Sequence, residues 1–166
     1  MPQHPASRST IAPSFTPAEW DLLVRLPGRL LIAATSPEGA GGTHAQALAG
    51  LEAIAAGRAS ASRLVRDVVA AIYSEQAPAD PAPRVAGLAD GVAGVLADCR
   101  AAARTVARRG GDADATAFRE WLLAIATAVC AAGTPAGSAA AIGPNGARVT
   151  PLRRRFLVDL SLALTG

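Results

Sequence analysis

Two aspartates ahead of an apolar segment have the spacing of metal ligands. Asp112, Asp114 and Thr116 occupy the positions that begin a calcium-binding EF-hand loop. The later positions do not fit, because Ala117 stands where the turn glycine belongs and Leu123 where the bidentate glutamate belongs. Acidic residues also suit the first turn of a helix, where they face its positive end. Asp112 and Asp114 are thus candidate metal ligands, but an N-cap at one of them or at Thr116 explains them without a metal.

Three arginines follow one another at steps of four residues. Arg100, Arg104 and Arg108 therefore lie on one face of a predicted helix, where they are candidates for contact with an anion or a partner. A solvated helix face, with cations near the helix C-terminus, explains them equally. The run Arg153-Arg154-Arg155 fans out by about 100° per residue, so its members cannot all meet one ligand. Few aromatic residues are present to stack on bases, which argues against binding of nucleic acid.

The sequence contains no recognisable group of residues that could act together in catalysis or bind zinc. The two histidines, His4 and His44, and the two cysteines, Cys99 and Cys130, are far apart in the sequence, which gives no zinc-ligand pair. The sequence contains no phosphate-binding loop, serine-hydrolase motif or dinucleotide-binding fingerprint. We expect two small buried thiols, no cofactor and no enzymatic activity.

Composition favours a single helical domain. The chain has 166 residues, is 51% hydrophobic but only 4% aromatic, and is rich in alanine, the strongest helix former. All sixteen basic residues are arginine and the net charge is +3, a pattern typical of a high-GC genome. The N-terminus lacks the apolar region of a signal peptide, and the apolar run 121–132 is too short for a membrane span. We expect a cytoplasmic protein with no membrane span.

Capping signals mark the first helices. Thr16-Pro17-Ala18-Glu19 is typical of a helix start with a capping box, and residues 1–15 are predicted to be a disordered tail. Pro27-Gly28 is expected to kink or break this first helix. A second helix is predicted from Thr43 to Ala56, with Leu48, Leu51 and Ile54 facing inward and Gly57 as its end. A third begins at Ser60 or Ser62, and 76–83 is predicted to be a linker.

The second half of the chain contains two longer helical patterns. Apolar residues at steps of three and four predict a long central helix over 84–109, which Gly110-Gly111 ends. Gly87, Gly91 and Gly94 form a strip along it that predicts close approach of another helix. A helical hairpin over 115–164 follows, with its second helix beginning at Thr150-Pro151.

The predicted core draws on the first helix, the helix over 84–109 and both helices of the hairpin. We expect it to include Trp20, Leu23, Leu30, Leu88, Val92, Val95, Phe118, Trp121, Leu122, Ile125, Phe156 and Leu160.

The two ends of the chain resemble a known family. Segments 15–20, 41–43, 118–133 and 146–150 with the last helix are similar to small proteins of the TerB-like (tellurite-resistance protein B-like) group from high-GC bacteria, over about half of the chain. The resemblance implies an all-α TerB-like bundle. It also implies clusters of Asp and Glu linked to metal binding, but Arg153 stands where a glutamate is usual, and the early loop offers only Glu38.

We therefore predict an all-α, single-domain helical bundle of about six helices over residues 16–166. The function that we expect is a non-enzymatic interaction or scaffold module, with a link to stress or envelope processes implied by the resemblance. Its partner is either another protein or a second copy of the chain. The alternatives are a divalent-metal-binding TerB-like protein and a nucleic-acid-binding protein that uses the arginine stripe.

Overall fold

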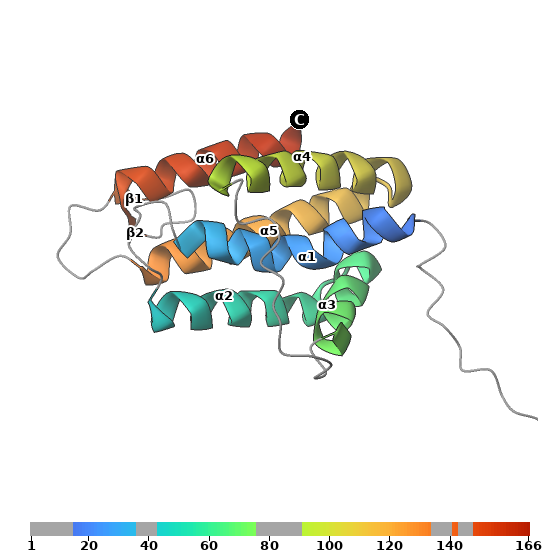
Figure 1. Cartoon of the computed structure of the whole chain (residues 1–166), viewed down its shortest axis with the longest axis horizontal. Helices are drawn as coiled ribbons and strands as arrows, with labels where there is room; N and C mark the ends of the chain where they lie inside the picture. The colour runs from blue at the N-terminus through green and yellow to red at the C-terminus, as the bar shows by residue number, and fades with distance from the viewer. Residues whose placement is uncertain (1–14, 36–42, 76–90, 134–140, 143–147) are drawn as a thin grey trace, which may run out of the picture.

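The protein is an all-α, single-domain helical bundle, as predicted (Figure 1). A computed structural model describes residues 15–35, 43–75, 91–133, 141–142 and 148–166. Within them lie six α-helices, a 3₁₀ turn over Gly57–Ala59, and a two-residue antiparallel pairing of β1 (Ala141–Ile142) with β2 (Arg148–Val149). The helices are α1 (Pro17–Thr35), α2 (His44–Ala56), α3 (Arg63–Glu75), α4 (Gly91–Arg109), α5 (Asp112–Ala132) and α6 (Pro151–Thr165).

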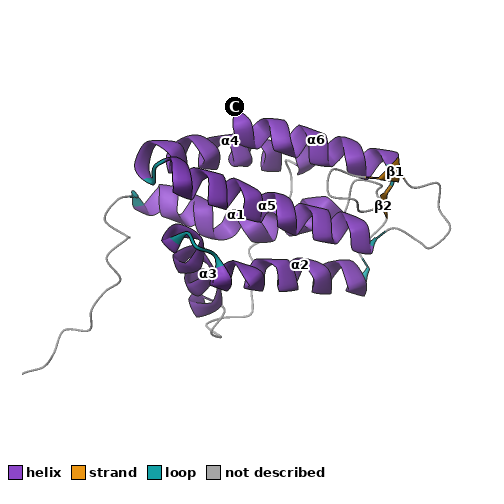
Figure 2. Cartoon of the chain, turned by 180° about the vertical axis from the view of Figure 1, so that it is seen from behind, coloured by secondary structure: helices purple, strands orange, loops and turns teal. Residues whose placement is uncertain are grey.

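The helices form three layers, with α4 and α6 on one side, α1 and α5 in the middle, and α2 and α3 on the other side (Figures 1 and 2). Helix α5 packs against all five other helices and is the longest of them, at 21 residues. The prediction that the helix over 84–109 is central was therefore wrong. The described part of that helix, α4, has 19 residues and lies in an outer layer, and residues 84–90 lie outside the described residues.

The start of α1 confirms the predicted capping box. The Thr16 amide donates to a carboxylate oxygen of Glu19 at 2.8 Å, and the Glu19 amide donates to the Thr16 hydroxyl at 3.2 Å. Phe15 and Trp20 flank this box with ring centroids 6.2 Å apart, which makes a hydrophobic staple. Phe15 is buried in the core, so the folded domain includes this residue, and the prediction that the disordered tail extends to residue 15 was wrong. Residues 1–14 lie outside the described residues.

Helix α1 runs through Pro27 to Thr35, so of the two outcomes expected at Pro27-Gly28, a kink or a break, the break does not occur. A proline inside a helix removes one backbone hydrogen bond at a cost of roughly 3 kcal/mol. Here Pro27 is itself buried, and Leu26 and Leu30 are completely buried on either side of it. The burial of this apolar stripe against the bundle holds the helix together across the proline.

Helix α2 has the predicted bounds, but the predicted inward face was largely wrong. Leu48 and Leu51 are each 49% exposed, and only Ile54 of the three expected residues is buried. The stripe that faces the bundle consists of Gln46, Gly50 and Ile54. A Cβ at Gly50 would lie 2.5 Å from a Leu31 methyl carbon and 2.8 Å from a Val129 methyl carbon, so the absence of a side chain lets α2 approach α1 and α5 closely.

Helices α2 and α3 meet at Gly57, which ends α2 as predicted and continues into the 3₁₀ turn. The Ser62 hydroxyl accepts a hydrogen bond from the Val65 amide at 3.3 Å and so caps α3. The apolar side of α3, with Leu64, Val65, Val68 and Val69, is buried. The segment 76–83, predicted to be a linker, lies outside the described residues.

Nine of the twelve predicted core residues are buried, and Trp20 and Val92 are partly buried against the core. Leu88 lies outside the described residues, as does Gly87. The close approach predicted at Gly91 was wrong, because a Cβ there would meet no atom within 4 Å. Gly91 instead has a positive φ of 52° at the first position of α4, a conformation that favours glycine.

Candidate functional site

The predicted arginine stripe lies on the exposed face of α4, but its three members have different environments. An Arg108 guanidinium nitrogen lies 3.4 Å from Glu19, which also pairs with Arg109 at 3.3 Å. This arrangement joins the end of α4 to the start of α1. Arg100 and Arg104 are exposed and have no ion-pair partner among the described residues. Only these two members of the stripe are therefore available for an external anion.

Glu19 is the carboxylate around which this junction is built. The hydrogen bond from the Thr16 backbone amide is the main cause that lowers the pKa of Glu19 below its ordinary value, and the positive charge of Arg109 lowers it further. The charged form of Glu19 thus caps α1 and pairs with two arginines. Glu19, Arg108 and Arg109 therefore link the start of α1 to the end of α4.

The two aspartates in the first turn of α5 do not cap it. Gly111 is the N-cap, with a φ of 84°, so the prediction that Asp112, Asp114 or Thr116 is the cap was wrong. Asp114 accepts a hydrogen bond from the Ser62 hydroxyl at 2.7 Å, which ties α5 to the cap of α3. Among the described residues, no group of three or more His, Cys, Asp or Glu side chains is placed to hold a metal ion.

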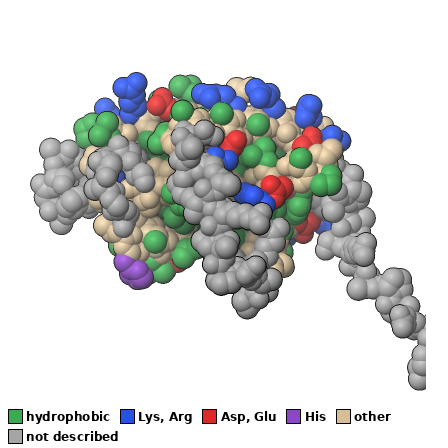
Figure 3. Space-filling view, in the orientation of Figure 1, with side chains coloured by type: hydrophobic (Ala, Val, Ile, Leu, Met, Phe, Trp, Pro, Cys, Tyr) green, Lys and Arg blue, Asp and Glu red, His purple; other side chains and the backbone are tan. Residues whose placement is uncertain are grey.

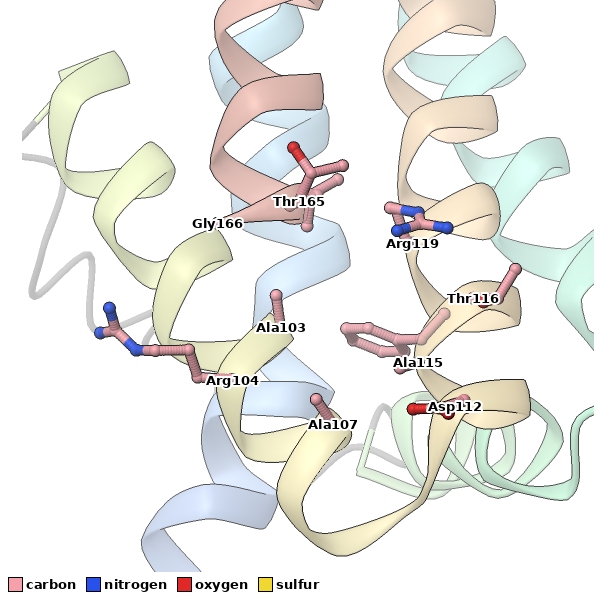
Figure 4. A pocket seen from close by; sticks show the side chains of 11 residues that line it. Ala103, Arg104, Ala107, Asp112, Ala115, Thr116, Arg119, Thr165 and Gly166 are labelled. Carbon is pink, nitrogen blue, oxygen red and sulfur yellow. The ribbon is translucent and has the colours of Figure 1, made fainter.

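A pocket of about 310 Å³ lies where the end of α4, the start of α5 and the end of α6 meet (Figure 4). Arg104 stands on one side and Arg119 on the other (Figure 4). Alanines of α4 and α5, with Phe118 and Leu164, supply the apolar part of its lining. The volume is at the lower end of the range of roughly 300–1,000 Å³ for small-molecule sites. Its polar lining thus includes residues of both charges, since Asp112 lines it together with the two arginines.

The pocket also contains one of the candidate aspartates, since Asp112 lies on its rim with Thr116. The structure thus brings Asp112 and Arg104 to the lining of one pocket, a proximity that their spacing in the sequence does not predict. Arg119 was missed as a site residue, because it belongs to a helix whose pattern indicated only core packing.

A second polar cluster, which the sequence analysis did not predict, is buried where three helix ends meet. Arg153, at the start of α6, is only 5% exposed, and its guanidinium donates to the Cys130 carbonyl at 3.3 Å. The Gln46 side chain, at the start of α2, donates to the Val129 carbonyl at 3.4 Å. A Cβ at Gly133 would collide with both side chains. Arg153 therefore caps the C-terminus of α5, where a cation is favoured.

Both cysteines are buried, as expected. Burial raises the pKa of the Cys99 thiol to about 12, with a smaller effect from Asp98. A thiol with this pKa is protonated at neutral pH and is a poor nucleophile.

Exposed apolar side chains occur on two opposite sides of the molecule. One group lies on α2, and the other, of Leu152, Val158 and Leu162, lies on α6. Figure 3 shows blue arginine side chains beside green hydrophobic ones along the upper edge, over α6 and α4. Helix α2 contains no arginine, so the two helices that carry these exposed apolar groups differ in charge.

Helix α5 is long and apolar enough to cross a membrane by length and composition, with a mean hydropathy of 1.3 over its most apolar stretch. The central helix of a bundle meets the same criteria, and α5 occupies that position here.

Comparison with family models, curated proteins and solved structures gave no match for this chain. The resemblance to the TerB-like proteins stays a prediction.

Proposed function

We propose that this protein is a non-enzymatic, cytoplasmic interaction module that pairs with a second copy of itself through the outward face of α2. The observation that carries the proposal is the exposure of Leu48 and Leu51 in the middle of this helix, each at 49%. The resemblance to the TerB-like proteins agrees with a small helical module of this kind, and adds a proposed link to stress or envelope processes.

Helix α2 is apolar on both of its sides. Its inner side, with Gly50 and Ile54, packs against the bundle, and its outer side carries two leucines with Ala45 nearby. A helix that is apolar all round normally has neighbours on both sides. The outer side has the composition of a helix–helix interface, where alanines allow two helices to approach closely.

The positions of the polar residues indicate a second copy as the neighbour. His44 and Glu52 are exposed and lie four residues before and four residues after Leu48, on the same side of α2. When two copies of α2 pair in antiparallel orientation about Leu48, His44 of each copy lies opposite Glu52 of the partner subunit. A twofold interface has this self-complementary property, with an apolar centre and matching polar groups at both ends.

Sedimentation equilibrium over a range of protein concentrations tests this proposal. We expect a reversible dimer for the wild type, and a monomer at the same concentrations for Leu48→Gln/Leu51→Gln. Val158→Gln/Leu162→Gln is the matched control, because it makes the same polar changes at exposed apolar residues of α6. A wild-type protein that remains a monomer, or a control that dissociates as strongly as the α2 variant, would rule out the proposal.

Charge exchange tests the antiparallel orientation. His44→Glu places two carboxylates opposite each other at both ends of the interface, so we expect it to weaken the dimer. The double variant His44→Glu/Glu52→Arg restores opposite charges and is expected to recover most of the affinity. No recovery in the double variant would contradict the antiparallel pairing, even if the dimer itself forms through α2.

A further inference from the structure

The outward surface of α4 and α6 combines cationic and apolar side chains. We define the cationic face by five exposed residues: Arg100 and Arg104 on α4, and Arg154, Val158 and Leu162 on α6. We propose that this face binds the surface of a membrane that contains anionic phospholipids. The proposal is independent of pairing through α2.

The five side chains share one surface because of their spacing. Arg154, Val158 and Leu162 follow one another at steps of four residues and therefore lie on one side of α6. Arg100 and Arg104 have the same spacing on α4. Helices α4 and α6 pack side by side in one outer layer (Figures 1 and 2). Figure 3 shows arginine and hydrophobic side chains together on the surface over these two helices.

The charge of this face is not neutralised by ion pairs within the part of the chain that the structure describes. Arg100, Arg104 and Arg154 have no acidic partner among the described residues, whereas the neighbouring Arg155 lies 3.9 Å from Asp159. A surface with unpaired arginines attracts an anionic leaflet, whose potential falls off within a Debye length. Each guanidinium can bind a lipid phosphate through two hydrogen bonds.

The apolar residues favour a lipid surface over other anionic partners. Leu162 is 64% exposed, the largest exposed fraction among the large hydrophobic side chains of the described residues, and Val158 is 48% exposed. Both lie on the same side of α6 as Arg154. Binding to a nucleic acid backbone would use the arginines but leave these two side chains in water. At a membrane surface, apolar side chains enter the boundary between headgroups and acyl chains while arginines remain at the headgroups.

The pocket at the α4–α5–α6 junction adjoins this face. Arg104 belongs to both, and Arg119 stands across the pocket from it (Figure 4). Figure 4 shows the Arg104 side chain directed away from the pocket and Arg119 on the opposite side, so the two guanidinium groups offer separate contacts to anionic headgroups. The surface is already formed by packed helices, so binding requires no folding of a new segment.

Flotation with lipid vesicles tests the proposal on the full chain. We expect the wild type to float with mixed phosphatidylglycerol–phosphatidylcholine vesicles, less so as salt is raised, and not with phosphatidylcholine alone. Arg100→Gln/Arg104→Gln is expected to lower the partition coefficient by about tenfold or more, since each arginine near an anionic surface contributes roughly a fivefold factor. Arg25→Gln/Arg63→Gln is the control, because it makes the same charge change at exposed arginines of α1 and α3.

A second pair of variants separates lipid binding from general anion binding. Leu162→Gln is expected to lower vesicle binding several-fold, whereas Ile32→Gln, a comparable change at an exposed apolar residue of α1, is expected to leave it unchanged. Absence of flotation by the wild type, or equal losses in variants and controls, would overturn the proposal. Retention on inorganic polyphosphate that Arg100→Gln/Arg104→Gln abolishes, combined with vesicle binding that Leu162→Gln does not change, would overturn it in favour of a phosphate polymer.

Discussion

Trp121 shows how much one side chain contributes to this fold. Its ring packs against Phe118 with centroids 5.9 Å apart, and its indole nitrogen donates to the Ala53 carbonyl at 3.2 Å. The residue is 7% exposed and links α5 to α2. Gly57 lies directly against the indole, where a Cβ would be 2.7 Å from the indole nitrogen. In a molecule with few aromatic residues, this contact is a large part of the core.

We therefore expect Trp121→Ala to lower the free energy of unfolding by roughly 3–5 kcal/mol, because it removes a large buried ring. Trp121→Phe keeps much of the apolar volume but loses the hydrogen bond to Ala53, so its effect is expected to be smaller. Urea unfolding monitored by circular dichroism measures both values. A urea unfolding curve that Trp121→Ala barely changes would contradict the assignment of this residue to the core.

Glu19 gives the molecule a pH-dependent contact. Its pKa is lowered in the folded state, so its charged form stabilises the fold at neutral pH. This contribution is present above the ordinary pKa of about 4.5 and is lost as the pH falls through the lower, folded-state value. Glu19→Gln keeps an acceptor for the Thr16 amide but removes the charge.

The difference in unfolding free energy between wild type and Glu19→Gln is accordingly expected to be largest at neutral pH and to shrink towards zero in acid. Thermal or urea unfolding at a series of pH values measures it. A difference that stays constant as the pH falls would mean that the charge of Glu19 does not contribute to stability.

At the scale of elements, the contact between α2 and the α1–α5 layer depends on a missing side chain. Gly50 faces Leu31 and Val129 at distances that leave no room for a Cβ, whereas Gly28, in the middle of α1, has no atom within 4 Å of that position. Substitution of alanine at these two glycines therefore compares a site with no room for a Cβ and a site with open space. In both helices alanine has the better helix propensity, by about 1 kcal/mol.

Gly28→Ala is expected to raise the free energy of unfolding by up to about 1 kcal/mol. Gly50→Ala is expected to lower it by roughly 1–3 kcal/mol, because the branched Val129 side chain cannot move away without disturbing the core. Denaturant unfolding of the two variants side by side gives the comparison. If Gly50→Ala were as stabilising as Gly28→Ala, α2 would not approach α5 as closely as the structure shows.

Local signals explain why most helix ends could be predicted from the sequence. Thr16 with Glu19, Thr150 before Pro151, and Gly110 all act on atoms within a few residues of themselves. The inward face of α2 could not be predicted in this way. Its alanines make several faces equally apolar, and the choice depends on how closely Gly50 meets residues of two other helices.

The candidate site was predicted only in part, for the same reason. The exposed position of Arg100 and Arg104 followed from their spacing. The pocket that joins Arg104 to Arg119 depends on where three helix ends meet, and nothing near these residues in the sequence specifies that meeting. Arg153 is a similar case, since its place beneath the C-terminus of α5 is a long-range contact.

At the scale of the whole molecule, the two exposed apolar surfaces lie on opposite sides of the bundle. Helix α2 is in one outer layer, and α4 and α6 are in the other (Figures 1 and 2). Use of one surface leaves the other accessible. A dimer formed through α2 would therefore present two cationic faces on its outer sides, so the two proposals are compatible.

The most direct test of the central claim is a comparison of methyl spectra of isotope-labelled protein at low and high concentration. Self-association through α2 predicts that the methyl signals of Leu48 and Leu51 shift as the concentration rises, while those of Val158 and Leu162 stay in place. Shifts confined to α6, or signals of Leu48 and Leu51 that do not move over the range in which the measured mass doubles, would contradict the account.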